Sequence, residues 1–308
     1  MYGLIIGLRN FLYDKSLLRS YRPGIPVIVV GNLIAGGTGK TPMVVWISLN
    51  LSEKYRVAVL SRGYGRRTRG FQFLDMHSTP ETVGDEPMEL RLLLPDVPIA
   101  VDRNRKRGIR NLSSGKYGNI DLIVMDDGFQ HRRVTPGFSI ILDDFNRPMR
   151  KEKLLPAGLR REPLSGLKRA DLIIETKKQI RQMNSLASSR IILITGIANP
   201  QPLADGISKT GTVCHHHKFP DHHRYTHAEA ASIRNLYYYH LRDGQLRAEP
   251  SSLLVLTTGK DYVKLIRFPE LSDIPLRRIP NGPPVEPDQE HEILNKIFKY
   301  VENTIGNG

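Results

Sequence analysis

The sequence predicts an α/β fold, in which a mostly parallel sheet flanked by helices is followed by a second, smaller α/β lobe. To about residue 175, short apolar runs alternate with segments of helical pattern. These runs are rich in Val, Ile and Leu and apolar throughout, as strands are when helices cover both faces of a sheet. A polar stretch then precedes a second series of apolar and helical segments. We therefore place the main domain at residues 1–190 and the smaller lobe at residues 191–308.

The elements follow from these runs in chain order. We expect strands at 26–31, 56–61, 97–101, 120–127, 138–144 and 170–176, and helices between them at 40–53, 86–93 and 103–112. The polar stretch 177–189 is expected to hold a short helix that leads to a linker. The smaller lobe begins with "RIILITGIANP" and continues with a helix in "HAEAASIRNLYYYHLR", the strand "SLLVLTT" and a terminal helix at 289–303.

The composition is that of a basic globular protein. Lys and Arg number 45 against 31 Asp and Glu, which gives a net charge of +14. This excess favours an anionic partner: nucleic acid, an acidic membrane surface or a phosphorylated substrate. The single cysteine, Cys214, excludes an internal disulfide and favours a reducing compartment.

The N-terminal segment is apolar only as far as Leu8, whereas a spanning helix needs about 20 apolar residues. Leu4, Leu8, Phe11 and Leu12 recur at helical spacing among basic residues. The pattern fits a helix on a membrane surface and, equally, a helix docked on its own domain.

A glycine-rich turn follows the first strand and precedes a helix, in "IAGGTGKT". Glycines allow consecutive backbone N–H groups to surround phosphate oxygens, and the helix adds its positive end. Lys40 is expected to reach the β- and γ-phosphates of ATP, and Thr41 to ligate Mg²⁺. The turn therefore predicts a P-loop NTPase-type core. Its nucleotide-binding residues are Ile34, Ala35, Gly36, Gly37, Thr38, Gly39, Lys40 and Thr41.

Two acids, Asp126 and Asp127, follow the apolar run "LIVM". Such an acid at the end of a neighbouring strand holds Mg²⁺, which we assign to Asp126, and a second orients the nucleophile, which we assign to Asp127. The alternative is an ordinary Asp-Gly turn.

Two basic segments are candidates for binding phosphate groups. "SRGYGRRTRG" follows a strand at the sheet edge where ligands gather, and "LLPAGLRREPL" contains an arginine pair. Each segment alone also fits a solvated surface. The arginines are Arg62, Arg66, Arg67 and Arg69 in the first segment and Arg160 and Arg161 in the second.

Six of the ten histidines fall in "CHHHKFPDHHRYTH". With Cys214 they raise the question of zinc, but no Cys-x-x-Cys or His-Glu-x-x-His spacing organises them. We favour a catalytic or exposed cluster over a structural metal site.

Six motifs in order, "VVGNLIAGGTGKTP", "SRGYGRR", "GDEP", "DDGFQHRR", "LLPAGLRREP" and "FPDHHRYT", resemble the tetraacyldisaccharide 4'-kinase family of lipid A biosynthesis. "TTGKDYVKL" is similar to that family's "TTEKDAVKL", with Gly259 in place of Glu. The resemblance implies ATP- and Mg²⁺-dependent phosphorylation of the 4'-hydroxyl of a tetraacylated glucosamine disaccharide 1-phosphate, which gives lipid IVA. It also implies a peripheral enzyme at the cytoplasmic face of the bacterial inner membrane, and a P-loop core with a smaller C-terminal lobe.

The resemblance extends to site residues. Lys40 and Thr41 match the phosphate-loop pair, and Asp126 and Asp127 match the metal-associated acids. His222 matches a histidine of the smaller lobe that closes over the active site. The substrate 1-phosphate is a further target for arginine side chains.

The family's Asp-Arg pair after the third strand, whose Asp is proposed to activate the hydroxyl together with that histidine, is altered here. Asn104-Arg105 stands at the best-aligned spacing, and Asp102-Arg103 comes two residues earlier. Since Asn cannot act as a base, either Asp102 takes this role or positioning and metal do most of the work.

Two other classes fit less well. A P-loop GTPase normally has an Asn-Lys-x-Asp segment, which the sequence lacks. A nucleic-acid-binding ATPase is favoured by charge alone, without a helix-turn-helix, an aromatic RNA-binding signature or a zinc module. We therefore expect a membrane-embedded lipid disaccharide as partner, and no nucleic acid.

Overall fold

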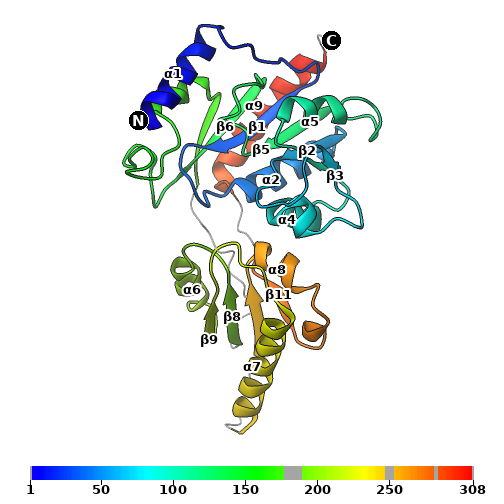
Figure 1. Cartoon of the computed structure of the whole chain (residues 1–308), viewed down its shortest axis with the longest axis vertical. Coiled ribbons are helices and arrows are strands. Elements are labelled where there is room, and N and C mark those ends of the chain that lie inside the picture. The colour runs from blue at the N-terminus through cyan, green and yellow to red at the C-terminus, as the bar shows by residue number, and fades with distance from the viewer. Residues whose placement is uncertain (1, 177–188, 247–252, 281–283, 307–308) are drawn as a thin grey trace. The chain divides into compact units, whose positions relative to one another are not determined.

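The computed structural model describes residues 2–176, 189–246, 253–280 and 284–306, and it divides into two compact units (Figure 1). The large unit consists of Met1–Lys178 and Pro283–Gly308, and the small unit of Gln179–Gly282. This division differs from the predicted one, because the terminal helix buries Ile293, Ile297 and Val301 in the core of the large unit. The stretch 177–189, where we expected a short helix, lies outside the described residues except for Ser189.

The large unit is built on a seven-stranded sheet that is parallel except for β3, a two-residue strand that the sequence pattern does not reveal. Parallel pairing brings the carboxyl ends of β1, β2, β4 and β5 to one edge, where the candidate site residues follow. The predicted parallel sheet is thus confirmed. In spatial order the strands are β3 (Gln72–Phe73), β4 (Ile99–Val101), β2 (Val57–Ser61), β5 (Leu122–Asp126), β1 (Val27–Asn32), β6 (Phe138–Asp144) and β7 (Leu172–Thr176).

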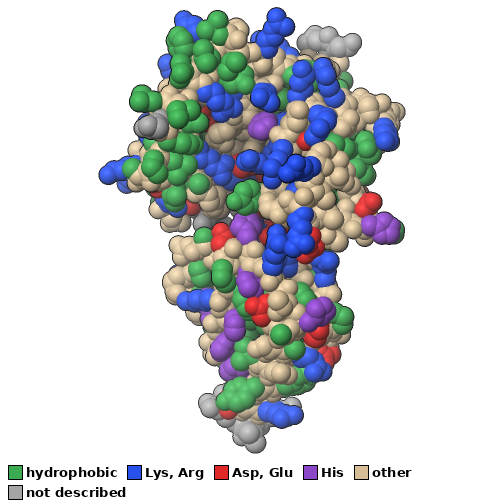
Figure 2. Space-filling view, viewed as in Figure 1, with side chains coloured by type: hydrophobic (Ala, Val, Ile, Leu, Met, Phe, Trp, Pro, Cys, Tyr) green, Lys and Arg blue, Asp and Glu red, His purple; other side chains and the backbone are tan. Residues whose placement is uncertain are grey.

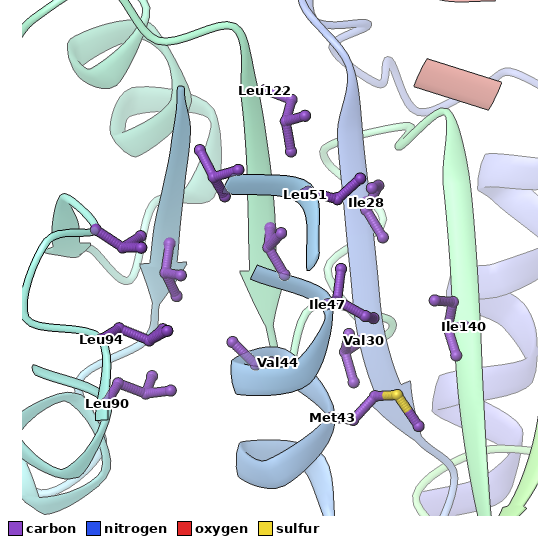
Figure 3. Close-up of a cluster of buried hydrophobic side chains, with 14 of the residues drawn as sticks. Ile28, Val30, Met43, Val44, Ile47, Leu51, Leu90, Leu94, Leu122 and Ile140 are labelled. Atoms are coloured by element: carbon purple, nitrogen blue, oxygen red, sulfur yellow. The ribbon is translucent and has the colours of Figure 1, made fainter. Parts of the chain in front are cut away.

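Helices cover both faces of this sheet, which explains why its strands are apolar throughout. Ile28 and Val30 of β1 belong to the core beneath α2, α4 and α9, part of which is drawn in Figure 3. Val27 and Val29 belong to the core on the opposite face, beneath α5 and a 3₁₀ turn. The elements are α1 (Tyr2–Asp14), α2 (Lys40–Ser52), α3 (Pro80–Val83), α4 (Asp85–Leu93), α5 (Arg105–Leu112), the 3₁₀ turn η1 (Leu164–Arg169) and α9 (Pro287–Ile305).

The small unit has a four-stranded parallel sheet with an apolar core on each face. Its strand β10 and helix α7 coincide with predicted elements, and β8 lies in the apolar stretch "RIILITGIANP", to which we assigned no element. Strand β9 was not predicted, because its sequence "TVCHHHK" contains no apolar run. In spatial order the strands are β11 (Leu276–Arg278), β10 (Leu253–Thr257), β8 (Arg190–Thr195) and β9 (Thr212–Lys218); the helices are α6 (Gln201–Ile207), α7 (His227–Leu246), α8 (Gly259–Leu265) and the 3₁₀ turn η3 (Pro269–Leu271).

Candidate active site

The glycine-rich turn lies where the sequence predicts it, between the end of β1 and the first residue of α2, Lys40. Gly36 and Gly39 have φ of 119° and 87°, a region that favours glycine. A Cβ atom at Gly36, Gly37 or Gly39 would meet no atom within 4 Å, so the space beside this backbone is open. Open space beside consecutive N–H groups at a helix start is what a phosphate chain needs.

Two residues that sequence reasoning missed hold this loop. The Asn32 side-chain amide donates to the Thr38 hydroxyl at 2.7 Å, and the Thr176 hydroxyl donates to the Thr38 carbonyl at 3.0 Å. All three side chains are buried. The signal for Asn32 is its position, since it is a polar residue that ends an otherwise apolar strand.

The second arginine segment runs beside the loop. The N–H of Ala35 donates to the Leu159 carbonyl at 2.8 Å, and the N–H of Arg161 donates to the Leu33 carbonyl at 2.7 Å. The structure separates the predicted arginine pair. Arg161 Nη1 lies 2.9 and 3.0 Å from the two carboxylate oxygens of Asp127, whereas Arg160 Nη1 donates to the Met149 carbonyl at 3.4 Å.

Asp126 ends β5 and is only 2% exposed. The Ser61 hydroxyl donates to its Oδ2 at 3.0 Å, while its Oδ1 has no hydrogen-bond partner among the described residues. Burial raises the pKa of Asp126 to about 7, with the nearby charges of Glu86 and Asp127 adding to the effect. A buried carboxylate oxygen without a donor, in a field that disfavours its charge, fits a group that a cation completes.

Asp127 has the opposite environment. Lys40 Nζ lies 3.7 Å from its Oδ1 and also donates to the Gly36 carbonyl at 3.4 Å. Burial alone would raise the pKa of Asp127, but Lys40 and Arg161 hold it below its usual value. Its φ of 47° is uncommon for a non-glycine residue. Two adjacent carboxyl groups with opposite pKa shifts are suited to two different roles.

Asp102 is fully buried, and both its oxygens are occupied. Arg107 Nε lies 2.7 Å from Oδ2 and Nη2 2.9 Å from Oδ1, and Oδ1 also accepts from the N–H of Asn104 at 2.8 Å. Asn104 in turn caps α5 by accepting from the N–H of Arg107 at 3.2 Å. This geometry supports Asp102 as an anchor of the start of α5 and does not present it as an available base.

Arg105, beside this anchor, ties two strand ends together. Its guanidinium donates to the Asp102 carbonyl at 2.5 Å and to the Asp126 carbonyl at 3.1 Å. Burial lowers the pKa of Arg105 to about 10, so it stays charged at neutral pH. The sequence signal was the aligned Asn104-Arg105 pair, although we did not assign the arginine a role.

Arg62 is exposed in the turn after β2, near His131. Burial lowers the pKa of His131 to about 4, helped by the charges of Arg105, Arg62 and Arg9, and its Nε2 lies 2.9 Å from the Arg103 carbonyl. Three cations around a neutral imidazole form a neighbourhood that favours an anionic group.

The remaining arginines of the first segment differ in environment. Arg66 is buried and donates to the carbonyls of Gly70 and Val101 at 2.5 and 3.4 Å, which fixes the segment itself. Arg67 and Arg69 are exposed.

His222 belongs to the small unit and lies in the turn after β9. Its side chain is 34% exposed, and its φ is 56°. In the described part of the chain, no group of three or more His, Cys, Asp or Glu side chains is arranged to hold a metal ion.

Comparison with known proteins identifies the family. The family model LpxK, tetraacyldisaccharide-1-P 4'-kinase, matches residues 1–188 and 176–299. Proteins named tetraacyldisaccharide 4'-kinase from Bacteroides thetaiotaomicron and Parabacteroides distasonis are 34% and 35% identical. The matches cover 99% and 100% of this chain and 92% and 94% of those proteins.

A solved structure agrees with this. The crystal structure of the "apo" form of LpxK from Aquifex aeolicus in complex with ATP superposes with a TM-score of 0.77 at 26% identity, over 97% of this chain and 96% of that chain. The predicted α/β fold and the predicted resemblance are therefore confirmed. The chain belongs to the tetraacyldisaccharide-1-P 4'-kinase family, a family of transferases of lipid A biosynthesis.

Proposed function

We propose that this chain transfers the γ-phosphoryl group of ATP to the 4'-hydroxyl of a tetraacylated glucosamine disaccharide 1-phosphate, which yields lipid IVA. The observation that carries the proposal is the open glycine loop at the start of α2, with Lys40 and Arg161 both directed at Asp127. Phosphoryl transfer depends mainly on alignment and on neutralising charge, and this arrangement offers both.

Within this proposal, the Lys40 ammonium leaves the Asp127 carboxylate and binds a phosphate group of ATP when the nucleotide enters the loop. Lys40 Nζ lies 3.7 Å from Asp127 Oδ1. A triphosphate in the loop offers Lys40 a stronger partner, and Arg161 remains beside Asp127. Asp127, which Arg161 still favours in its charged form, then orients the attacking hydroxyl and accepts its proton.

Thr41 and Asp126 are the residues that would hold Mg²⁺. Asp126 Oδ1, which has no hydrogen-bond partner among the residues that the structure describes, supports this assignment. Mg²⁺ usually takes only one or two protein ligands beside phosphates and water. When bound there, the ion would supply positive charge that neutralises the phosphate oxygens.

Arg62 and Arg161 are proposed to bind phosphate groups of substrate or nucleotide. Arg160 is the weaker candidate, because its guanidinium is bound to the Met149 carbonyl. His222 is proposed to act from the small unit on the 4'-hydroxyl. Asp102, with both oxygens occupied, is proposed only to position α5.

The orientation of helix α1 supports the proposal that it contacts a membrane surface. A helix docked on its own domain normally turns its apolar side inward, whereas α1 turns apolar side chains outward. Its polar side contacts the large unit: Tyr2 donates to the Arg161 carbonyl, Arg9 to the Gln130 carbonyl and Asn10 to Glu162. Its apolar side faces outward, as Figure 2 shows. Leu4, Ile5, Leu8 and Phe11 are 80%, 59%, 61% and 51% exposed.

In the part of the chain that the structure describes, no helix is sufficiently long and apolar to cross a bilayer. We infer that α1 inserts its apolar side into the cytoplasmic face of the inner membrane, where a substrate with four acyl chains resides. The net charge of +14 favours the anionic lipids of that surface, and no nucleic acid is invoked as a partner.

The test is transfer of label. The protein, the disaccharide 1-phosphate and γ-labelled ATP are incubated with Mg²⁺, and the labelled position on the sugar is located by mass spectrometry. We expect label on the 4'-oxygen, with Lys40→Ala as the inactive control. Label on another hydroxyl, or hydrolysis of ATP without transfer, would contradict the proposal.

A further inference from the structure

The segment "TTGKDYVKL" forms the end of β10 and helix α8 of the small unit, and it contains a fully buried carboxylate, Asp261. Asp261 Oδ2 accepts from the N–H of Gly196 and from the Thr258 hydroxyl, each at 2.8 Å. Lys264 Nζ lies 3.2 Å from Oδ1. Since desolvating two charges is unfavourable, a gain in stability does not explain this pair, and a role in fixing the local geometry does.

Lys264 connects this pair to the turn that carries His222. Its side chain is 8% exposed, and Nζ donates to the His223 carbonyl at 3.1 Å and lies 5.5 Å from the centre of the Tyr225 ring. The turn is also packed, because the ring of Phe219 stacks on His223 with centroids 4.7 Å apart.

Gly196 connects Asp261 to the same turn from the other side. Its N–H donates to Asp261, and its carbonyl accepts from the N–H of His222 at 3.2 Å. A Cβ at Gly196 would lie 2.7 Å from Asp261 Oδ1 and 3.3 Å from the Pro220 carbonyl oxygen. The strand end, the buried carboxylate and the turn therefore approach one another more closely than a larger residue allows.

His222 needs such support. Its φ of 56° lies in the left-handed region, which a non-glycine residue occupies only where its surroundings hold it. The hydrogen bonds on either side of it both connect to the Asp261–Lys264 pair. Lys264 donates directly to the His223 carbonyl, and the His222 N–H donates to the carbonyl of Gly196, whose own N–H is bound to Asp261.

We propose that Asp261 and Lys264 are positioning residues that hold the turn around His222, so that its imidazole is presented in one orientation for the reaction. The inference rests on the proposed function, which assigns His222 its role. Gly259, where the chain departs from the family pattern, begins α8 and leaves Thr258, Asp261 and Lys264 in place.

The test is a double-mutant cycle on the full chain with ATP and the disaccharide 1-phosphate. Lys264→Met keeps the aliphatic stem but removes the donor. We expect kcat to fall by about 10- to 100-fold, the range that misplacement of a reacting group produces, with KM for ATP unchanged because the phosphate loop is in the large unit. In a His222→Ala background the same change is expected to leave kcat unaltered.

Arg190→Met is the matched control. Arg190 is also a buried cation of the small unit, and it donates to the His240 carbonyl at 2.9 Å and lies 3.6 Å from Asp243. It begins β8, whereas Gly196 follows the end of that strand. We expect it to lower Tm without changing kcat. If Lys264→Met does not fold, Asp261→Asn, nearly isosteric, replaces it with the same expectation.

The outcomes distinguish the positioning role of Asp261 and Lys264 from the role of His222 itself. If His222→Ala lowers kcat but Lys264→Met lowers it equally in both backgrounds, positioning is overturned while the role of His222 stands. A decrease in kcat with Arg190→Met equal to that with Lys264→Met also overturns positioning, because any loss of stability would then suffice. If His222→Ala leaves kcat unchanged, the proposed role of His222 fails and the inference fails with it.

Discussion

The two units hold their candidate reactive groups by different kinds of ion pair. In the large unit, Lys40, Asp127 and Arg161 meet with side chains 11%, 22% and 27% exposed. In the small unit, Asp261 and Lys264 are 0% and 8% exposed. The pairs of the large unit are partly exposed and can exchange partners, whereas a buried pair that loses one member leaves an uncompensated charge. The first is suited to receiving a charged ligand and the second to keeping a turn fixed.

We expect the largest effect from a substitution in the partly exposed Lys40–Asp127 pair. Lys40→Ala should reduce turnover by about 10³-fold or more, since a cation on the transferring phosphate accounts for effects of that size in phosphoryl transfer. Tm should change little, because the side chain is not part of the apolar core. Steady-state kinetics and thermal unfolding check this, and normal ATP consumption by the folded variant would remove Lys40 from the site.

Arg161→Met should have the next largest effect. Losing this cation raises the pKa of Asp127, so the acidic limb of the pH–rate profile should move to higher pH, and activity should fall by about 10- to 100-fold at neutral pH. Arg160→Met is the matched control with a small effect, because Arg160 contacts the Met149 carbonyl instead. An equal loss of activity in the two variants would instead indicate that both arginines bind the substrate.

Substitutions at and around Asp102 test whether it is a catalytic base or a residue that anchors the start of α5. We expect Asp102→Ala to slow turnover more than Asn104→Ala and to lower Tm, because it removes a buried partner of Arg107. If Asp102 is an anchor, Arg107→Ala should reproduce much of the kinetic loss. A far larger loss for Asp102→Ala than for Arg107→Ala, at equal Tm, would identify Asp102 as the base after all.

Substitutions on the exposed apolar side of α1 test our proposal that this side binds the membrane. The double variant Leu4→Glu/Leu8→Glu should reduce sedimentation with anionic liposomes several-fold at unchanged Tm, because both side chains are exposed. Leu49→Glu changes another exposed leucine, 51% exposed on α2, and should leave sedimentation unaffected. Equal binding by all three proteins would exclude α1 as the membrane contact.

The smallest effect concerns His131. Its pKa is lowered to about 4 from an ordinary 6.5, so the unfolded chain binds the proton more readily. Stability from this group is complete above about pH 6.5 and is lost as pH falls toward 4. Tm of the unmodified protein should therefore fall between pH 7 and pH 5 more steeply than Tm of His131→Gln. Parallel decreases would contradict this.

The sequence predicted those parts of the molecule in which local pattern decides structure. Six strands of the main sheet and the glycine-rich loop after β1 follow from apolar runs and glycine spacing. Strand β9 was missed, because its three central histidines become a strand only by pairing with β8. The terminal helix was assigned to the smaller lobe, because chain order gives no sign that it returns to the first core.

The sequence also predicted only part of the candidate site, namely the residues that lie next to recognisable motifs. Lys40 and Asp127 each belong to a recognisable motif, and the structure brings them together, with Lys40 Nζ 3.7 Å from Asp127 Oδ1. Thr176 and Arg105 were missed, because their roles depend on contacts with distant parts of the chain. Asn32 was missed because its contact with Thr38 depends on how the loop folds back. The contacts that occupy both oxygens of Asp102 could not be predicted from spacing either, since they depend on the direction in which α5 places the side chain of Arg107.

The most direct test of the account is a crystal structure with a non-hydrolysable ATP analogue and Mg²⁺. We predict density for the triphosphate against the backbone N–H groups of Gly36–Gly39, with Lys40 Nζ moved from Asp127 to a phosphate oxygen and the metal beside Thr41 and Asp126. A loop that stays empty at saturating analogue, with Lys40 still paired to Asp127, would contradict the assignment of this loop as the ATP site.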